Sequence, residues 1–312
     1  MRKTTLFALL LAGCGAQPPP NSDTLAGFTY PAAPPNGIQI VLPIVRNLQP
    51  GSDNEICTWT DTIVDVDTDV KGLQAFQAPM GHHVVLFSTK VFQPAGTNRP
   101  CTDDDMSTFR FSVGAGGEGQ AGLNEAPGDL TYRIPAKSQV VINHHYINAT
   151  NQVHDSQSVV NIFYADPALK LTPVSSLAFV NTNFKLPPTG MSSLDINCTM
   201  QRDVNAYQLF PHMHQYGAHI VFEKTSPAGK TDRMFDIPWS PDYQFHPPQM
   251  MTDPSKPFVF AKGDLVHIHC DWVNPTGKPL TFGLEMCVGF AAAIDSDNQG
   301  NIACDDGAWG PF

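Results

Sequence analysis

The sequence predicts an all-β protein, and three observations lead to this expectation. Proline supplies 28 of 312 residues, or about 9%, against about 5% in ordinary globular domains. Charged residues supply only 15%, against about 25%. This composition disfavours helices, because proline removes a helix donor and exposed helix positions favour Lys and Glu. In place of a helical period, the chain shows short β-branched or aromatic stretches between Pro, Gly, Asn and Asp clusters.

These apolar stretches are the expected strands. They are Ile38–Val45, His82–Phe87, Gln139–Ile147, Val159–Tyr164, Ala218–Glu223, Leu265–Val273 and Leu280–Phe290. Strands of this length and spacing predict antiparallel sandwiches or barrels. The glycine-rich segment Gly114–Gly122 is expected to be a flexible loop. It is not a nucleotide-binding loop, because no Lys-Ser/Thr pair follows it and no helix pattern begins there.

The length of the chain suits two domains. The segment Ala165–Val174 contains two prolines and lies near the middle of the chain. We expect a boundary there, with an N-terminal domain over 37–168 and a C-terminal domain over 169–312.

The N-terminus has the layout of an export signal. A basic start, Met1-Arg2-Lys3, precedes an apolar core too short to span a bilayer, and Leu11-Ala12-Gly13-Cys14 follows. These residues look like a bacterial lipobox, which predicts a signal peptide over 1–13 and lipidation of Cys14. The alternative is an ordinary signal cut elsewhere. Residues 14–36 are proline-rich and are expected to form an extended tether.

Charge and cysteine content agree with export. The net charge of −11 and the absence of a basic run argue against nucleic-acid binding. Gly15 rather than Asp after Cys14 favours the outer membrane in a bacterium with two membranes. Six further cysteines, none spaced as CxxC, favour three disulfides in an oxidising compartment. Spacing leaves all 15 pairings open.

Histidine carries the strongest functional signal. Nine of the 11 histidines lie in pairs or near-pairs: His82-His83, His144-His145, His212-x-His214 with His219 nearby, and His267-x-His269. Imidazole is the commonest ligand of zinc and copper, and residues i and i+2 of a strand project to one face. His212 and His214 can therefore bind one ion together.

Two pairs need separate treatment. His82 and His83 are consecutive, so both can bind one ion only at a strand end or bulge, and Pro79-Met80-Gly81 supplies such an irregularity. His267 and His269 alternate with apolar residues and face either solvent or the other domain. The residues alone do not separate this pair from His212 and His214. We expect the isolated His154 and His246 to be structural or solvated.

Four motifs in order resemble a known family. They are Gly81–Phe87 (GHHVVLF), His144-His145-Tyr146, Pro211–Gly217 (PHMHQYG) and Glu285-Met286-Cys287. The set is similar to that of the type II copper, ascorbate-dependent monooxygenases, the family of peptidylglycine α-hydroxylating monooxygenase and dopamine β-hydroxylase. The resemblance covers about Cys57 to Cys304 and implies two tandem antiparallel jelly-roll-like β-sandwich domains with one copper ion each.

The resemblance also implies a role for each matching residue. The first copper, which transfers electrons, would be held by His82, His83 and His145, whereas His144 should point to the opposite face. The second, which binds O2 and hydroxylates a substrate C–H bond, would be held by His212, His214 and Met286. A thioether favours Cu(I), although core packing is the alternative role for Met286. The family pattern implies disulfides Cys57–Cys101, Cys198–Cys304 and Cys270–Cys287.

The chain differs from the family at the positions where the peptidylglycine enzyme binds a substrate carboxylate with Arg, Asn and Tyr. Phe210, Val288 and Phe290 stand at those positions. Burying a carboxylate without a cationic partner is costly, so we expect a small apolar or aromatic substrate. Phe210 and Phe290 are thus candidate pocket residues, with core packing as the alternative.

The resulting hypothesis is a lipid-anchored, extracytoplasmic, monomeric oxidoreductase that uses O2 and an ascorbate-like donor. One rival is a copper-handling lipoprotein without turnover. The other is an adhesion module whose histidines are structural.

Overall fold

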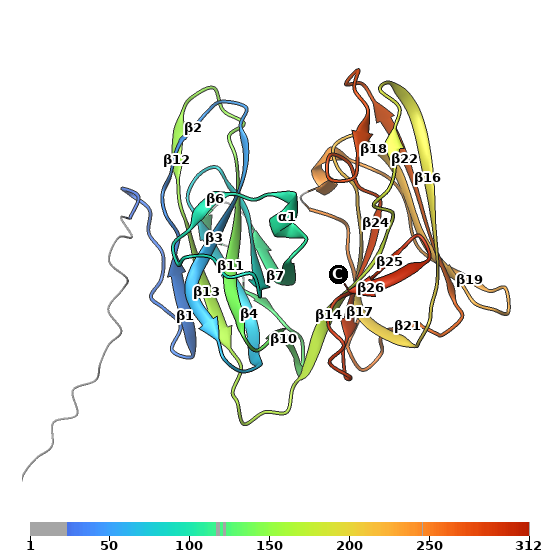
Figure 1. The fold of residues 1–312 in the computed structure, drawn as a ribbon, viewed down its shortest axis with the longest axis horizontal. Coiled ribbons are helices and arrows are strands. Elements are labelled where there is room, and N and C mark those ends of the chain that lie inside the picture. Colours follow the sequence, from blue (N-terminus) through green and yellow to red (C-terminus); the bar gives the residue numbers. More distant parts are fainter. Residues whose placement is uncertain (1–23, 117–118, 121–122, 245, 312) are drawn as a thin grey trace, which may run out of the picture.

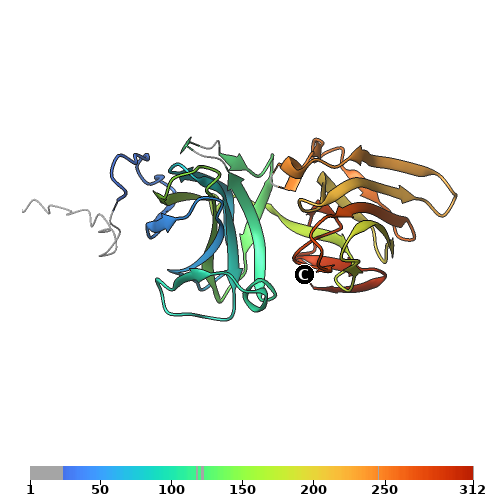
Figure 2. The ribbon, with the colours of Figure 1, turned by 90° about the horizontal axis from the view of Figure 1, so that it is seen from above.

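The computed structural model describes residues 24–116, 119–120, 123–244 and 246–311. Strands make up most of this part of the chain, and its helices are limited to α1 (Asp103–Met106) and a 3-10 turn, η1 (Pro241–Gln244). The strands form two β-sandwiches side by side (Figure 1, Figure 2). The predicted all-β sandwich class is confirmed.

The N-terminal sandwich has a five-stranded layer whose strands lie in the order β6, β3, β11, β5, β7. These are Asn98–Pro100, Asp53–Val64, Ser138–Ile147, Gly81–Thr89 and Phe109–Gly116. The layer against it contains β1 (Gly37–Val41), β13 (Ser158–Tyr164), β4 (Thr68–Gln77) and β10 (Leu130–Ile134). Fully buried apolar side chains fill the space between the layers, among them Leu73, Val84, Ile142 and Val160.

Shorter strands complete this half. They are β2 (Val45–Leu48) paired with β12 (His154–Ser156), and β8 (Gly119–Gln120) and β9 (Asn124–Glu125) along β4.

The C-terminal sandwich has a four-stranded outer layer in the order β16, β22, β18, β19. These are Gly190–Thr199, Leu265–Asn274, Gly217–Thr225 and Thr231–Pro238. The layer against it contains β14 (Thr172–Val180), β24 (Val288–Ile294), β17 (Val204–His212) and β20 (Met250–Met251). Additional short strands are β21 (Phe258–Phe260), β25 (Ile302–Asp305), β26 (Ala308–Pro311), and β15 (Lys185–Leu186) with β23 (Leu280–Thr281).

One continuous sheet joins the two sandwiches. Strands β10 and β14 pair in parallel, with Leu130 opposite Thr172 and Tyr132 opposite Val174. The core contributes to the joint as well, because Tyr207 of β17 is buried in the N-terminal core cluster. Residues 165–171 connect β13 to β14. The expectation of purely antiparallel sheets therefore needs a correction, since β14 is parallel to both β10 and β25.

Three expected segments differ from the structure. The stretch Ile38–Val45 divides between β1 and β2. The stretch Leu280–Phe290 is broken, because a turn at Gly283, whose φ is +93°, separates β23 from β24. The glycine-rich segment is not wholly a loop, since β7 extends to Gly116 and β8 follows.

The first part of the chain was predicted to be a signal and tether. Residues 1–23, including the expected lipidation site Cys14, lie outside the described residues. In the following segment the Leu25 amide donates to the Gln157 side chain at 2.8 Å, so part of the predicted tether lies against the sandwich. Within the described residues, no helix is both long enough and apolar enough to cross a bilayer.

The chain contains the three disulfides Cys57–Cys101, Cys198–Cys304 and Cys270–Cys287. One lies in the N-terminal sandwich and two lie in the C-terminal sandwich. Disulfides persist in oxidising compartments, so they indicate an extracytoplasmic location.

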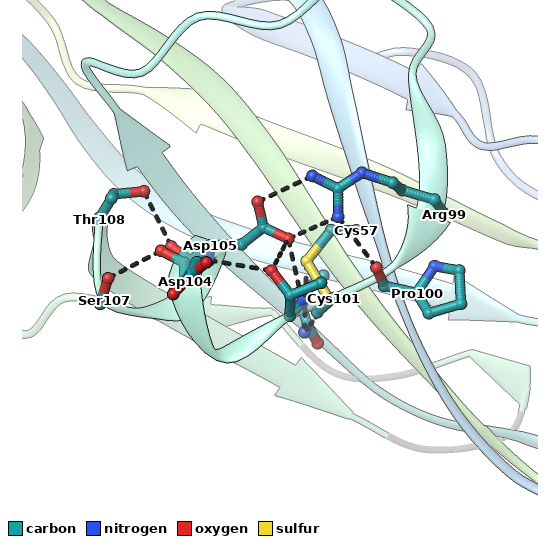
Figure 3. Close-up of polar contacts among 10 residues, drawn as sticks. Cys57, Arg99, Pro100, Cys101, Asp104, Asp105, Ser107 and Thr108 are labelled. Atoms are coloured by element: carbon teal, nitrogen blue, oxygen red, sulfur yellow. Dashed lines mark hydrogen bonds and ion pairs between the residues drawn. A yellow bond between two sulfur atoms is a disulfide. The ribbon is translucent and has the colours of Figure 1, made fainter.

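A compact polar network surrounds the first disulfide (Figure 3). The Arg99 guanidinium donates to both carboxylate oxygens of Asp105, and its carbon lies 4.5 Å from the centre of the Trp59 ring. Asp105 also accepts from the amide of Thr102, while the Thr102 hydroxyl accepts from the Asp105 amide at 3.2 Å. This reciprocal cap begins α1, and the bonds from Arg99 tie it to β6, which ends just before Cys101.

We predict that Asp105→Asn lowers the free energy of unfolding by about 1 kcal/mol at pH 7. The hydrogen bond from Arg99 lowers the pKa of Asp105 to about 2 from its usual 3.8. A depressed carboxyl pKa stabilises the fold above pH 4, and this stabilisation is lost as pH falls toward 2. Denaturant titrations should therefore show the gap between variant and wild type closing over that range.

The neighbouring variant Asp104→Asn is the control. The contact of Asp104 in Figure 3 is made by its backbone carbonyl, which accepts from Ser107 and which the substitution leaves in place. It should match the wild type at each pH. A gap for Asp105→Asn that stays constant down to pH 2 would contradict the assignment.

Candidate functional site

Three of the predicted ligand histidines come together at one end of the five-stranded layer. His82 and His83 belong to β5, and His145 belongs to the neighbouring β11. One nitrogen from each ring lies within 4.8 Å of the others. The ring centres are 4.8 to 5.3 Å apart, so the group has the size of a metal-binding site.

A β-bulge allows consecutive histidines to take part. His83 lies directly opposite His145, but the next pair joins Gly81 to Tyr146, so His82 is an extra residue in β5. Such a residue can turn toward the side of its neighbour. The irregularity expected at Pro79-Met80-Gly81 is present: Met80 has a φ of +77°, and a Cβ on Gly81 would meet the Gln77 Cβ at 2.3 Å.

The surroundings keep the two β5 imidazoles neutral. Burial lowers the pKa of His82 to about 4 and that of His83 to about 3. The Nε2 of His145 hydrogen-bonds to Asp53, and this bond lowers the pKa of the carboxyl. Because Nε2 bonds to Asp53, His145 would present Nδ1 to a metal ion. A carboxylate behind a ligating imidazole is the usual means of fixing its tautomer and orientation.

His144 points to the other face, as expected. Its ring is fully buried, with Nε2 2.9 Å from the Thr58 hydroxyl and Nδ1 2.8 Å from the Tyr146 hydroxyl. It belongs to the polar interior of the sandwich rather than to the histidine cluster.

The second predicted pair lies on the C-terminal sandwich. His212 is the last residue of β17, and His214 follows in the turn before β18. Their ring centres are 5.1 Å apart and nearly perpendicular. Burial lowers the pKa of His212 to about 3. The Nδ1 of His214 lies 3.2 Å from the Leu284 carbonyl oxygen, so it carries the proton and leaves Nε2 free for a metal.

Met286 lies in the loop between β23 and β24 rather than within a strand. The turn at Gly283 ends the β23 ladder before this residue. Cys287 is nonetheless fixed, through its disulfide to Cys270 of β22. Met286 packs with Phe290 in an apolar cluster, and the Phe290 ring lies 6.3 Å from that of His212.

Glu285, which the sequence analysis did not select as a functional residue, connects the two loops. Its carboxylate is fully buried and accepts from the amides of His214 (3.1 Å) and Tyr216 (2.8 Å) and from the Trp272 indole (3.0 Å). Burial raises the pKa of Glu285, whereas these donors oppose the rise. One side chain thereby holds the His214 loop against the Met286 loop.

The two candidate pocket residues also meet. Phe210 of β17 lies directly opposite Phe290 of β24, and their rings stack at 5.0 Å. His212 lies opposite Val288 in the same ladder, two residues along from each Phe, so the side chains share one face. Both Phe rings line a cavity of about 170 Å³ between the sandwiches, with Phe111 and Tyr132 on the N-terminal side.

Histidines of the C-terminal half approach the first cluster across the interface. A charge on His212 would contribute to lowering the pKa of His83. His246, which follows η1 in the C-terminal half, lies 5.5 Å from His82 between ring centres. We expected His246 to be structural or solvated. Its position beside His82 depends on the contact between sandwiches, and no local sequence pattern reveals it.

His267 and His269 lie apart from both clusters. Val266, Ile268, Cys270 and Trp272 of β22 are fully buried, as predicted, so the two histidines project from the opposite, outer face of the four-stranded layer. There they meet Asp195, which the sequence analysis did not single out.

Comparisons with known proteins do not extend these observations. No protein-family model matches the chain, and no curated protein matches its sequence. The exported protein XepA of PBSX is 11% identical, with 85% of this chain and 89% of that chain covered, at a TM-score of 0.24. An infectious bursal disease virus structure (Gt strain) is 12% identical, with coverage of 86% and 75%, at 0.20. Scores this low carry no inference about this chain.

We predict that Glu285→Gln lowers the free energy of unfolding by about 1–3 kcal/mol, because an NH2 group replaces one carboxylate oxygen and leaves at least one of the three N–H donors without its acceptor. Guanidinium titration followed by tryptophan fluorescence measures the change. The control is Glu125→Gln, at an exposed carboxylate of β9, which should have wild-type stability. Equal stability of Glu285→Gln and wild type would show that the buried carboxylate does not hold the loops.

Proposed function

We propose that this protein is a dicopper monooxygenase that hydroxylates a C–H bond of a small apolar or aromatic substrate with O2 and an ascorbate-like donor. One observation carries the proposal. Each sandwich gathers buried or half-buried imidazoles, and the His212 ring of the second group lies 6.3 Å from Phe290, which lines a cavity between the sandwiches.

The donor sets fit copper. His82, His83 and His145 offer three nitrogens within a common sphere, and imidazole accommodates both oxidation states of copper. His212 and His214 offer two more, and Met286 supplies a soft thioether that favours Cu(I). Bound copper would supply one-electron transfer at the first group and oxygen activation at the second.

The chain's own residues prepare these donors. Burial keeps His82, His83 and His212 neutral at neutral pH, so their lone pairs are available without release of a proton. Asp53 orients His145, and the Leu284 carbonyl orients His214. Glu285 holds the His214 loop in place through backbone amides.

The cavity supports an uncharged substrate. Among the described residues, its lining includes no acidic or basic side chain, and Phe210 and Phe290 offer stacked aromatic surface next to His212. A carboxylate would meet no cation there, and its desolvation would be uncompensated. We therefore propose an aromatic or aliphatic hydrocarbon portion as the group that is bound.

The proposal includes an exported monomer that is anchored by a lipid on Cys14, in the outer membrane of a bacterium with two membranes. The disulfides support the export, and the lipobox-like residues before Cys14 support the anchor.

Copper stoichiometry and O2 consumption test the proposal against its rivals. A chain carrying His267→Ala, which disrupts the separate histidine pair on the outer face, should hold two copper ions after reconstitution and dialysis. It should consume O2 with ascorbate while it hydroxylates an apolar substrate. Two ions without coupled product would favour the copper-handling lipoprotein. Near-zero copper would favour the adhesion module and exclude both copper functions.

We predict that Met286→Ala reduces coupled hydroxylation by at least 100-fold while copper at the first histidine group is retained. The loss follows from removing the ligand that favours Cu(I). Product formation per O2 consumed and copper per chain are the measurements. The matched control is Met191→Ala, because Met191 is 79% exposed and remote in the outer layer. Full turnover by Met286→Ala would remove Met286 from the mechanism.

We predict that Phe210→Arg shifts the substrate preference from ethylbenzene toward phenylacetate by about 10-fold or more in kcat/KM. The guanidinium would supply the missing cation for the carboxylate and would place a charge beside apolar substrate. Phe92→Arg, at a half-exposed Phe outside the cavity, is the control and should preserve the ratio. An unchanged ratio in Phe210→Arg would show that this face does not bind substrate.

A further inference from the structure

A third group of potential ligands lies on the outer face of the C-terminal sandwich. His267 and His269 project from β22, and Asp195 of β16 lies directly opposite His269 in the ladder. One ligand atom from each of the three residues lies within 4.8 Å of the others. All three side chains are open to solvent, so an ion can reach them without any rearrangement of the fold.

The two imidazoles converge on a single carboxylate oxygen. Asp195 Oδ1 lies 2.7 Å from His267 Nε2 and 2.8 Å from His269 Nδ1. An ion with ligand distances of about 2.0–2.2 Å would fit between these atoms after only a small separation of the side chains.

A second carboxylate stands behind each ring. Glu223 Oε1 of β18 lies 3.2 Å from His267 Nδ1, and Asp271 Oδ1 lies 3.3 Å from His269 Nε2. Every ring nitrogen of the pair therefore faces an oxygen acceptor. A neutral imidazole has only one N–H, so each ring needs either a second proton or a metal ion on its other nitrogen. Imidazole placed between a metal and a carboxylate is the usual arrangement in metal sites.

The local charge also suits a divalent cation. Asp195, Glu223 and Asp271 bring three negative charges, and Arg233, 2.8 Å from Glu223, offsets one of them. His219 lies on the same face and is not one of the three converging residues. Its Nε2 lies 2.9 Å from Asp236, and its Nδ1 lies 3.8 Å from Asp271.

From this convergence we infer that Asp195, His267 and His269 form a surface site for a divalent transition-metal ion of the Zn²⁺ class. Glu223 and Asp271 act as positioning residues that hold the two imidazoles. Two imidazoles, one carboxylate and a solvent-facing position make a tetrahedral set that Zn²⁺ accepts. The site uses none of the residues of the proposed copper groups and does not depend on the proposed function.

Equilibrium dialysis of the metal-stripped protein against Zn²⁺ at pH 7.5 tests this site. The variants His267→Ala and Asp195→Asn should each bind one ion fewer per chain than the wild type. Zn²⁺ that enters the other histidine groups contributes equally to all these proteins, so the difference isolates the surface site. His219→Ala, which removes an exposed imidazole from the same face, is the matched control and should bind as many ions as the wild type.

Glu223→Gln provides a graded test. It keeps all three ligands but weakens the hold on His267, so the affinity of this ion should fall about 10-fold or more with unchanged stoichiometry. Co²⁺ gives an independent readout, because the visible d–d absorbance per chain should be lower in His267→Ala than in the wild type by the contribution of this site, and unchanged in His219→Ala. Identical Zn²⁺ binding by the wild type, His267→Ala and Asp195→Asn would overturn the proposal, as would an equal loss in His219→Ala.

Discussion

The edge-to-edge joint between β10 and β14 is the constraint on which the candidate functional site depends. It continues one sheet from the first sandwich into the second, and Tyr207 is buried in the core of the opposite half. Asn301 strengthens the joint by donating to the Phe111 carbonyl and accepting from the Ser176 amide. Because main-chain pairing and a shared core both resist rotation, His83 and His212 keep a defined relation across the interface.

Irregular backbone at strand ends places the ligands within each half. A bulge brings His82 beside His83, and a turn outside the ladder carries Met286. Regular strands could not do this, because neighbouring side chains alternate between faces. Buried carboxylate bonds and a disulfide replace the lost ladder contacts, as Glu285 and Cys287 illustrate. The same two kinds of stabilisation, polar and covalent, occur around Cys57 in the first half.

The potential ligands on the outer face of the C-terminal layer are positioned in a different way. Its His267, His269 and Asp195 come from straight, regularly paired strands, so alternation alone puts them on one surface. The chain thus gathers histidine in two ways: by distorting strands next to the interface, and by simple periodicity away from it. Only the second way can be read from spacing, and even there the carboxylate partners lie on neighbouring strands whose register the sequence does not state.

The sequence by itself determined the all-β class, the buried face of β22 and the irregularity before His82, because alternation, composition and Gly or Pro placement act locally. The copper function stays a prediction from motif resemblance. Only the tertiary structure decided that the sandwiches share a sheet, that Phe210 stacks on Phe290, that Glu285 binds the His214 loop and that His246 lies beside His82. Each of these contacts joins residues distant in the chain, so strand register and packing decide them rather than any local pattern.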